Sequence, residues 1–74
     1  MLLEDFYIIE EWHKNKQWTQ DLRELIIERH KMAFENWSEG ELTEWWKDEQ
    51  NNLCIRYDSG KWWRYKVGKY GLEW

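Results

Sequence analysis

The sequence has 74 residues with no proline, four glycines, one cysteine and eight tryptophans, and its formal net charge is −4. A chain of this length buries only about 60% of the surface that its unfolded form exposes, which excludes a two-domain enzyme and predicts one small domain over residues 1–74. Because 42% of the residues are hydrophobic and 35% are charged, the composition is that of a soluble globular domain rather than a disordered segment.

Cys54 is the single cysteine, so the chain cannot form an internal disulfide and does not resemble the small secreted proteins that disulfides hold together. The N-terminus carries no basic segment, and its apolar run at residues 6–9 is too short for a signal peptide or a membrane span. We therefore expect a cytoplasmic protein with no membrane association.

The first predicted element is a helix over about residues 2–13. Side chains at helical spacing share one face there: Leu2, Phe6, Ile9 and His13. The apolar run at residues 6–9 also suits a strand, so both alternatives stay open and the helix is favoured. The polar residues 14–17 then form a short turn into a second, antiparallel helix.

A second amphipathic helix is predicted over about residues 19–37. Apolar residues recur here at spacings of three and four: Trp18, Leu22, Leu25, Ile26, Met32, Ala33 and Trp37. Thr19 is a suitable N-cap, Asp21 complements the helix dipole, and Gly40 lies where a helix commonly ends. The two elements together predict a helical hairpin over residues 2–37.

Beyond Gly40 the apolar residues alternate with a period of two, which is typical of strands. Three short strands are expected: residues 42–47, 53–57 and 61–67. The connections at residues 48–52 and 58–60 consist of turn-forming residues, so the strands should form an antiparallel meander over residues 42–67, followed by a tail at residues 68–74. The predicted fold class is α+β, an N-terminal helical hairpin packed on a three-stranded antiparallel β-meander.

The last hairpin can close through a two-residue or a three-residue loop, and each loop gives its own register. A two-residue loop at residues 59–60 mixes apolar and charged residues on one face. A three-residue loop with Gly60 in the left-handed conformation pairs Ile55 with Trp63 and gathers the apolar residues, so we prefer it. The core face of the hairpin is then expected to contain these residues: Leu53, Ile55, Tyr57, Trp63, Tyr65 and Val67.

The opposite face of this hairpin has the composition of a binding surface. Arg56, Arg64 and Lys66 surround Trp62 there, which suits single-stranded nucleic acid because cations hold phosphates while an indole ring stacks on a base. The alternative is a solvated outer face on which Trp62 packs against the arginine side chains. Three cations are also few for a nucleic-acid-binding patch.

Two pairs of adjacent tryptophans, at residues 45–46 and 62–63, lie on predicted strands, where neighbouring side chains point to opposite faces. If the core takes one ring of each pair, the other ring is left outside. This predicts an exposed aromatic patch that includes Trp46 and Trp74, of the kind that forms hot spots in protein interfaces. The alternative is a sheet packed on both sides, with the tail folded back.

Charge is unevenly distributed along the chain, with a net charge of −7 over residues 1–50 and +3 over residues 51–74. The acidic side chains of the helical part offer a negative surface to a basic partner protein: Glu4, Glu10, Glu11, Glu24, Glu28 and Glu35. The alternative is a solvated helical face on which nearby lysines and arginines neutralise part of this charge.

The sequence contains no motif typical of an enzyme, a cofactor site or a metal site. His13, His30 and Cys54 are not spaced as a zinc site. In the preferred register Cys54 points away from the helices, so a nucleophilic pair of Cys54 and His30 is not expected. We therefore predict a protein without catalytic, cofactor-binding or metal-binding residues.

The leading hypothesis is a small acidic, non-enzymatic protein-interaction module, an inhibitor or regulator that occupies the functional groove of a partner protein. Small proteins of this kind are common among the accessory genes of mobile elements. The second hypothesis is a single-stranded nucleic-acid-binding domain that uses the aromatic and basic face of the sheet. A homodimer is compatible with both, because Ile27, Phe34 and the spare tryptophans could pair across a two-fold axis.

Overall fold

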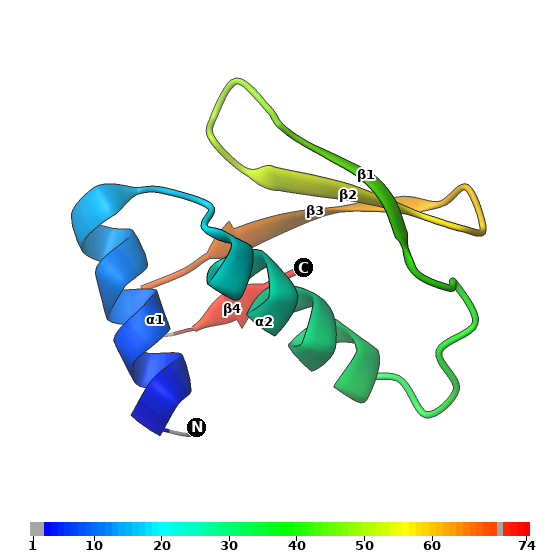
Figure 1. The fold of residues 1–74 in the computed structure, drawn as a ribbon, viewed down its shortest axis with the longest axis horizontal. Helices are drawn as coiled ribbons and strands as arrows, with labels where there is room; N and C mark the ends of the chain where they lie inside the picture. The colour runs from blue at the N-terminus through cyan, green and yellow to red at the C-terminus, as the bar shows by residue number, and fades with distance from the viewer. Residues whose placement is uncertain (1–2, 70) are drawn as a thin grey trace.

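The computed structural model describes residues 3–69 and 71–74, with side chains from residue 6 onward. Two helices come first in the chain and a four-stranded antiparallel sheet follows, so the fold is α+β, as predicted. Both helices lie on one side of the sheet, and within the described part of the chain the other face has no second layer (Figure 1). The predicted start of the first helix at residue 2 lies outside the described residues.

The first helix, α1, spans Leu3–Asn15, which decides between the two alternatives in favour of the predicted helix. Among the side chains of this helix that the structure describes, Ile9 and Trp12 are buried. The helix ends where Lys16 takes a left-handed backbone conformation with φ 55°. The turn that follows brings the ring of Trp18 to 4.4 Å from that of Trp12, so the connection between the helices is part of the core.

The second helix, α2, spans Gln20–Met32 and begins as predicted. Thr19 is its N-cap, because the side-chain oxygen Oγ1 accepts a hydrogen bond from the backbone N–H of Leu22 at 3.2 Å. Asp21 lies in the first turn, where its charge complements the helix dipole. The buried side chains of α2 form one stripe: Leu22, Leu25, Ile26 and His30.

Replacing Thr19 by alanine should lower the free energy of unfolding by about 1 kcal/mol, the usual cost of losing a hydroxyl N-cap. Thr19→Ser keeps the oxygen acceptor and should stay close to the wild type. Urea unfolding of the two variants measures the difference. Equal loss of stability in both would show that the methyl group of Thr19, and not the cap, is what matters.

The prediction that this helix continues to residue 37 is wrong, because α2 ends at Met32. The N–H of Ala33 is shared between the carbonyl oxygens of the preceding turn, and the chain then leaves the helix axis. Trp37 consequently turns back towards the sheet, where its indole N–H donates to the carbonyl of Gly40 at 2.8 Å and its ring lies 5.0 Å from that of Tyr57. A continued helix could not make these contacts.

The sheet contains the three predicted strands and one more. Their bounds are as follows: β1 Leu42–Lys47, β2 Leu53–Tyr57, β3 Trp62–Val67 and β4 Leu72–Glu73. The order in the sheet is the order in the chain, and all neighbours are antiparallel. The short strand β4 lies in the segment that the sequence predicts as a tail, and it pairs with β3.

The predicted three-residue loop between β2 and β3 is confirmed. Gly60 has φ +91°, and the N–H of Tyr57 donates to the carbonyl of Lys61 at 3.0 Å. Ile55 consequently lies opposite Trp63, as expected. The loop chemistry therefore sets which side chains of the hairpin face the helices.

The core forms between the apolar stripes of the helices and the inner face of the sheet. Its buried members are as follows: Trp12, Trp18, Leu22, Ile26, Leu53, Ile55, Tyr57 and Tyr65. Large aromatic side chains thus supply a substantial share of the core in a chain of limited length. The indole N–H of Trp18 is satisfied by the carbonyl of Asn51 at 2.7 Å, which also ties the helical hairpin to the turn between β1 and β2.

Candidate functional site

The outer face of the sheet, defined here as the face turned away from the helices, carries the residues of the predicted nucleic-acid site. Arg56 of β2 lies opposite Trp62 of β3, and Cys54 lies opposite Arg64. Lys66 is exposed on the same strand as Trp62 and Arg64. Trp62 keeps 44% of its surface exposed. Alternation along the strands therefore brings the predicted residues together on one face.

Acidic side chains accompany the cations of the outer face. Nη1 of Arg56 lies 3.3 Å from Oε1 of Glu44, and Nε of Arg64 lies 2.9 Å from Oδ2 of Asp48. The guanidinium group of Arg64 also lies 5.5 Å from the ring of Trp62. Two of the three predicted phosphate ligands are therefore engaged with carboxylates of the same molecule, which weakens their attraction for a polyanion.

The prediction that Trp46 is exposed is wrong, because its neighbours on the outer face cover it in part. Its ring lies 5.7 Å from that of Trp62, and the guanidinium group of Arg56 lies 5.6 Å from it. This layer of aromatic rings and arginines also covers Cys54, which points outward as predicted and is nevertheless only 1% exposed. The exposed member of the pair is Trp45, on the helix side, at 41%.

Trp74 is 46% exposed, as predicted, but it does not join Trp46 in one patch. Its ring centroid lies 5.1 Å from that of His30, a residue of α2. Trp74 therefore lies on the helix side of the sheet, whereas Trp46 lies on the outer face. The tail thus folds back as in the alternative interpretation, but on the helix side, and within the described residues the sheet is not packed on both sides as that alternative expected.

The predicted acidic residues lie on the helices and on the turn after α2. All of those with described side chains are exposed: Glu10, Glu11, Glu24, Glu28 and Glu35. The side chain of Glu4 lies outside the described part of the structure. Glu24 accepts a hydrogen bond from the side chain of Gln20 at 3.0 Å, and Glu28 lies 3.5 Å from Arg29. These contacts between exposed groups leave most of the carboxylate surface accessible to a partner.

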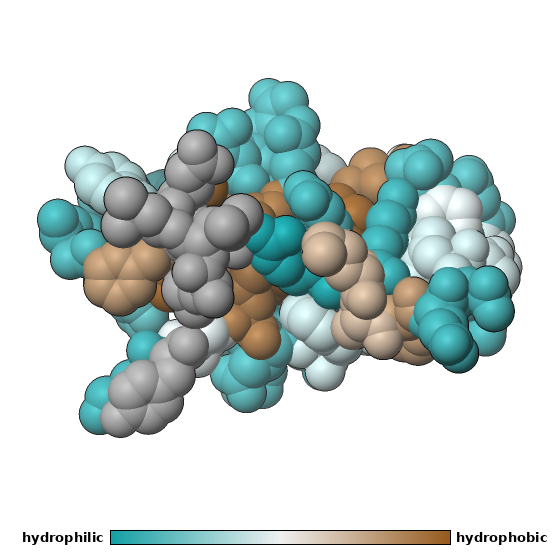
Figure 2. All heavy atoms as spheres, turned by 90° about the horizontal axis from the view of Figure 1, so that it is seen from below, coloured by the Kyte–Doolittle hydropathy of each residue, from teal (hydrophilic) through white to brown (hydrophobic). Residues whose placement is uncertain are grey.

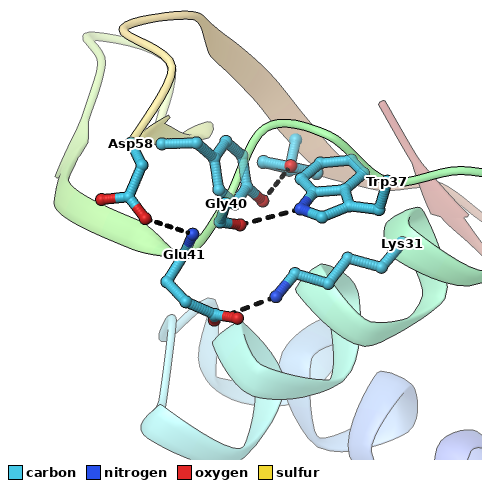
Figure 3. Close-up of polar contacts among 7 residues, drawn as sticks. Lys31, Trp37, Gly40, Glu41 and Asp58 are labelled. Carbon is cyan, nitrogen blue, oxygen red and sulfur yellow. Dashed lines mark hydrogen bonds and ion pairs between the residues drawn. The ribbon is translucent and has the colours of Figure 1, made fainter.

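The helix α2 runs alongside β1, with one contact to the strand itself and one to Glu41, the residue that precedes it. Near the start of the helix, the guanidinium group of Arg23 lies 4.1 Å from the ring of Trp45. Near its end, Nζ of Lys31 donates to Oε2 of Glu41 at 3.0 Å (Figure 3). Because Arg23 precedes Lys31 whereas Trp45 follows Glu41, the two elements run in opposite directions.

The segment before β1 is fixed by contacts that bring Glu41 to α2. The backbone N–H of Glu41 donates to Oδ2 of Asp58 at 2.8 Å, while Trp37 holds the carbonyl of Gly40 (Figure 3). Gly40 has φ +81°, and a Cβ atom there would lie 2.5 Å from the carboxylate of Asp58. Only glycine fits this position without a rearrangement, so the glycine that was expected to end a helix instead positions an acidic residue.

A surface groove of about 470 Å³ lies on α2 beside this contact. It is lined by these residues: Glu24, Ile27, Glu28, Lys31, Met32 and Glu41. Ile27 is half-buried against the core, and Met32 is 70% exposed. Seen from below, the surface of the molecule also shows apolar side chains between hydrophilic ones (Figure 2). The groove thus combines an apolar surface with three carboxylates.

A buried histidine is the feature that sequence reasoning missed. His30 is 0% exposed, and its Nδ1 lies 2.6 Å from the hydroxyl of Tyr65, which in turn lies 2.5 Å from that of Tyr57. Burial lowers the pKa of His30 below its ordinary value of 6.5. Burial also raises the pKa of Tyr57 and Tyr65, so both hydroxyls are uncharged near neutral pH.

Aromatic rings surround this histidine on several sides. Ring centroids lie 5.0–5.3 Å from that of His30 for the following residues: Phe34, Trp37, Trp63, Tyr65 and Trp74. Nε2 of His30 has no hydrogen-bond partner among the described residues. The imidazole therefore acts as a core side chain held by one hydrogen bond. Its spacing of four residues from Ile26 places it on the buried stripe of α2, but the prediction counted only apolar residues, and histidine is intermediate between the buried and the exposed residue types.

Within residues 3–69 and 71–74, no group of three or more His, Cys, Asp or Glu side chains could hold a metal ion. No described helix is long and apolar enough to cross a membrane. No family model, curated protein or solved structure matches this chain.

Proposed function

We propose that this protein is a small, non-enzymatic interaction module, an inhibitor or regulator that presents the acidic side of α2 to a basic groove of a partner protein. The observation that carries the proposal is the groove on α2, where Glu24, Glu28 and Glu41 border the apolar side chains of Ile27 and Met32. Carboxylates of this kind steer a basic partner and suppress wrong ones, while apolar surface contributes to affinity.

The outer face of the sheet supports the second candidate, single-stranded nucleic-acid binding, less well. Trp62 is accessible to a base, which favours that candidate. However, Arg56 and Arg64 already contact Glu44 and Asp48, so a phosphate would have to displace a carboxylate from each of them. Glu28 and Glu41 of the α2 groove are likewise paired, with Arg29 and Lys31, so a basic partner meets a similar cost there. The apolar side chains of Ile27 and Met32 beside these carboxylates favour the groove, and we place the function there.

The experiment that tests the proposal is parallel affinity capture from one lysate with the wild type and with a variant that carries Glu24→Gln, Glu28→Gln and Glu41→Gln. A partner captured by the wild type should bind the variant about tenfold more weakly, because three exposed carboxylate contacts of modest strength are lost together. Most of the loss should lie in the association rate, and it should shrink at high salt. Surface plasmon resonance at two salt concentrations measures both.

A matched control carries Glu10→Gln, Glu11→Gln and Glu49→Gln, which changes the net charge equally but leaves the groove intact. This control should bind the partner nearly as well as the wild type. If both triple variants bind equally, overall charge rather than the α2 groove attracts the partner, and the proposal is wrong. If single-stranded DNA displaces the captured partner from this protein, the result favours the outer face of the sheet as the binding surface instead.

A further inference from the structure

The strand β1 has an open edge. It lies at the border of the sheet, and within the described residues it pairs with β2 alone (Figure 1). The N–H of Asp48 donates to the carbonyl of Asn52 at 3.1 Å, towards β2. Because hydrogen-bonding direction alternates along an antiparallel strand, Trp46 also faces β2, whereas the backbone groups of Trp45 and Lys47 point away from the sheet. These groups can pair with another extended chain.

The open edge of β1 and the groove on α2 belong to one side of the molecule. The contacts of Arg23 with Trp45 and of Lys31 with Glu41 are separated by about 12 Å along the helix and about 13 Å along the strand. The two lengths are nearly equal, so the helix and the strand stay side by side between the two contacts. A chain added to the edge of β1 would present every second side chain to α2, as Trp45 does.

The chemistry of this side selects long cationic side chains on the added chain. Ile27 and Met32 offer apolar surface to an aliphatic stem, and Glu24 and Glu28 offer carboxylates to its charged end. Lysine and arginine combine both properties. At one end of the groove, the ammonium group of Lys31 already pairs with the carboxylate of Glu41. This internal ion pair has the chemistry that we expect between the groove and a lysine of the partner.

A second copy of this chain suits the edge poorly. Two copies would bring together molecules of net charge −4, each with the same acidic groove. The edge therefore favours a basic partner over self-association.

We infer that this side of the molecule binds an extended, lysine- or arginine-containing segment of a partner protein, which adds to β1 as a further antiparallel or parallel strand and turns its cationic side chains towards α2. Backbone hydrogen bonds to Trp45 and Lys47 supply the strand pairing, and the carboxylates of the groove select the sequence. This inference rests on the proposed function in that it uses the same acidic side of α2, but it assigns the contact to an extended segment of the partner rather than to a groove of the partner.

The test uses a synthetic probe, a peptide of about ten residues in which lysine and valine alternate. A peptide of the same composition with the lysines and valines in two blocks has the same charge without the alternation. Hydrogen exchange of the full chain followed by NMR should show that the alternating peptide protects the amides of Trp45 and Lys47. The amide of Asp48, which is already hydrogen-bonded, is the internal control and should change little.

A matched pair of variants separates strand pairing from charge. Lys47→Pro removes an N–H that points away from the sheet and costs no hydrogen bond to β2, whereas Lys47→Thr removes the same charge and keeps the N–H. The proline variant should bind the alternating peptide about tenfold more weakly than the threonine variant, because backbone hydrogen bonds to the peptide are lost. If the proline variant does not fold, amide protection in the wild type still decides.

The outcomes distinguish this inference from the proposed function. In one outcome, the glutamine substitutions at Glu24, Glu28 and Glu41 weaken peptide binding, but the peptide does not protect the amides of Trp45 and Lys47. That outcome overturns strand addition and leaves the acidic groove as the binding surface. Protection that the glutamine substitutions leave unchanged supports strand addition and overturns the proposed use of the carboxylates. Failure of the alternating peptide to bind better than the block peptide overturns strand addition.

Discussion

Replacing Tyr65 by phenylalanine is expected to lower the free energy of unfolding by about 3 kcal/mol, a large share of what a small domain possesses. The hydroxyl of Tyr65 is the middle member of a buried row, within hydrogen-bond distance of Nδ1 of His30 on one side and of the hydroxyl of Tyr57 on the other. Its removal leaves two buried polar groups without a partner, and each of them was desolvated when the chain folded.

Tyr57→Phe is the matched control, because it removes the same atom from the end of the row. Tyr65 then keeps its contact with His30, and we expect a loss of only about 1 kcal/mol. Urea unfolding at neutral pH, followed by circular dichroism, compares the two. If the two variants lose equal stability, the hydrogen bond between His30 and Tyr65 contributes little, and the row is held by ring packing alone.

Acidification should destabilise the fold through His30. Its pKa is lowered in the folded state by burial, so between the ordinary value of 6.5 and the lower folded value the unfolded chain binds a proton that the folded chain does not. Stability is therefore complete above about pH 6.5 and falls as the pH drops below it, at a rate of at most about 1.4 kcal/mol per pH unit, until the pH reaches the lower folded pKa. The neutral hydroxyls of Tyr57 and Tyr65 provide no negative charge to oppose this loss.

The measurement is urea unfolding at several pH values between about pH 7 and about pH 5, for the wild type and for His30→Gln. Glutamine does not titrate in this range, so any remaining slope in the variant reports the other titratable groups of the chain. The wild type should lose stability more steeply than the variant. Parallel slopes would mean that the folded protein accepts a proton on His30 without cost, and NMR of the imidazole would then show the charged form in the folded state.

Local chemistry made the second half of the chain predictable. The three residues 58–60 close the hairpin with Gly60 in the left-handed conformation, and the period-two alternation then leaves only one register that buries the apolar residues. The same alternation placed Arg56, Trp62, Arg64 and Lys66 on one face. These features depend on neighbours along the sequence or directly across one hairpin, which is the information that a single sequence contains.

Features that depend on distant contacts were not predictable in the same way. The helical pattern continues to Trp37, yet α2 ends at Met32 because Trp37 gains contacts with the sheet that the pattern cannot reveal. His30 lies four residues after Ile26 on the apolar stripe, but the hydroxyl that pairs with its imidazole belongs to Tyr65, 35 residues away, and the local pattern did not reveal that contact. Likewise, the ion pairs of Glu44 and Asp48 with the cations of the outer face follow from a strand pairing that the prediction left without a register.

Cys54 gives the sheet an internal reporter of its own motion. The thiol lies on the outer face, where Trp46 and Arg64 are its neighbours on the two adjacent strands, and Cys54 is only 1% exposed. A thiol-specific reagent can therefore react only while the side chains over it move aside. The rate of labelling consequently measures how often the side chains over Cys54 open, and no engineered probe is needed. Because the chain has one cysteine, every labelled molecule records the same event, and anything that binds over the tryptophans would slow the reaction while binding along β1 would not.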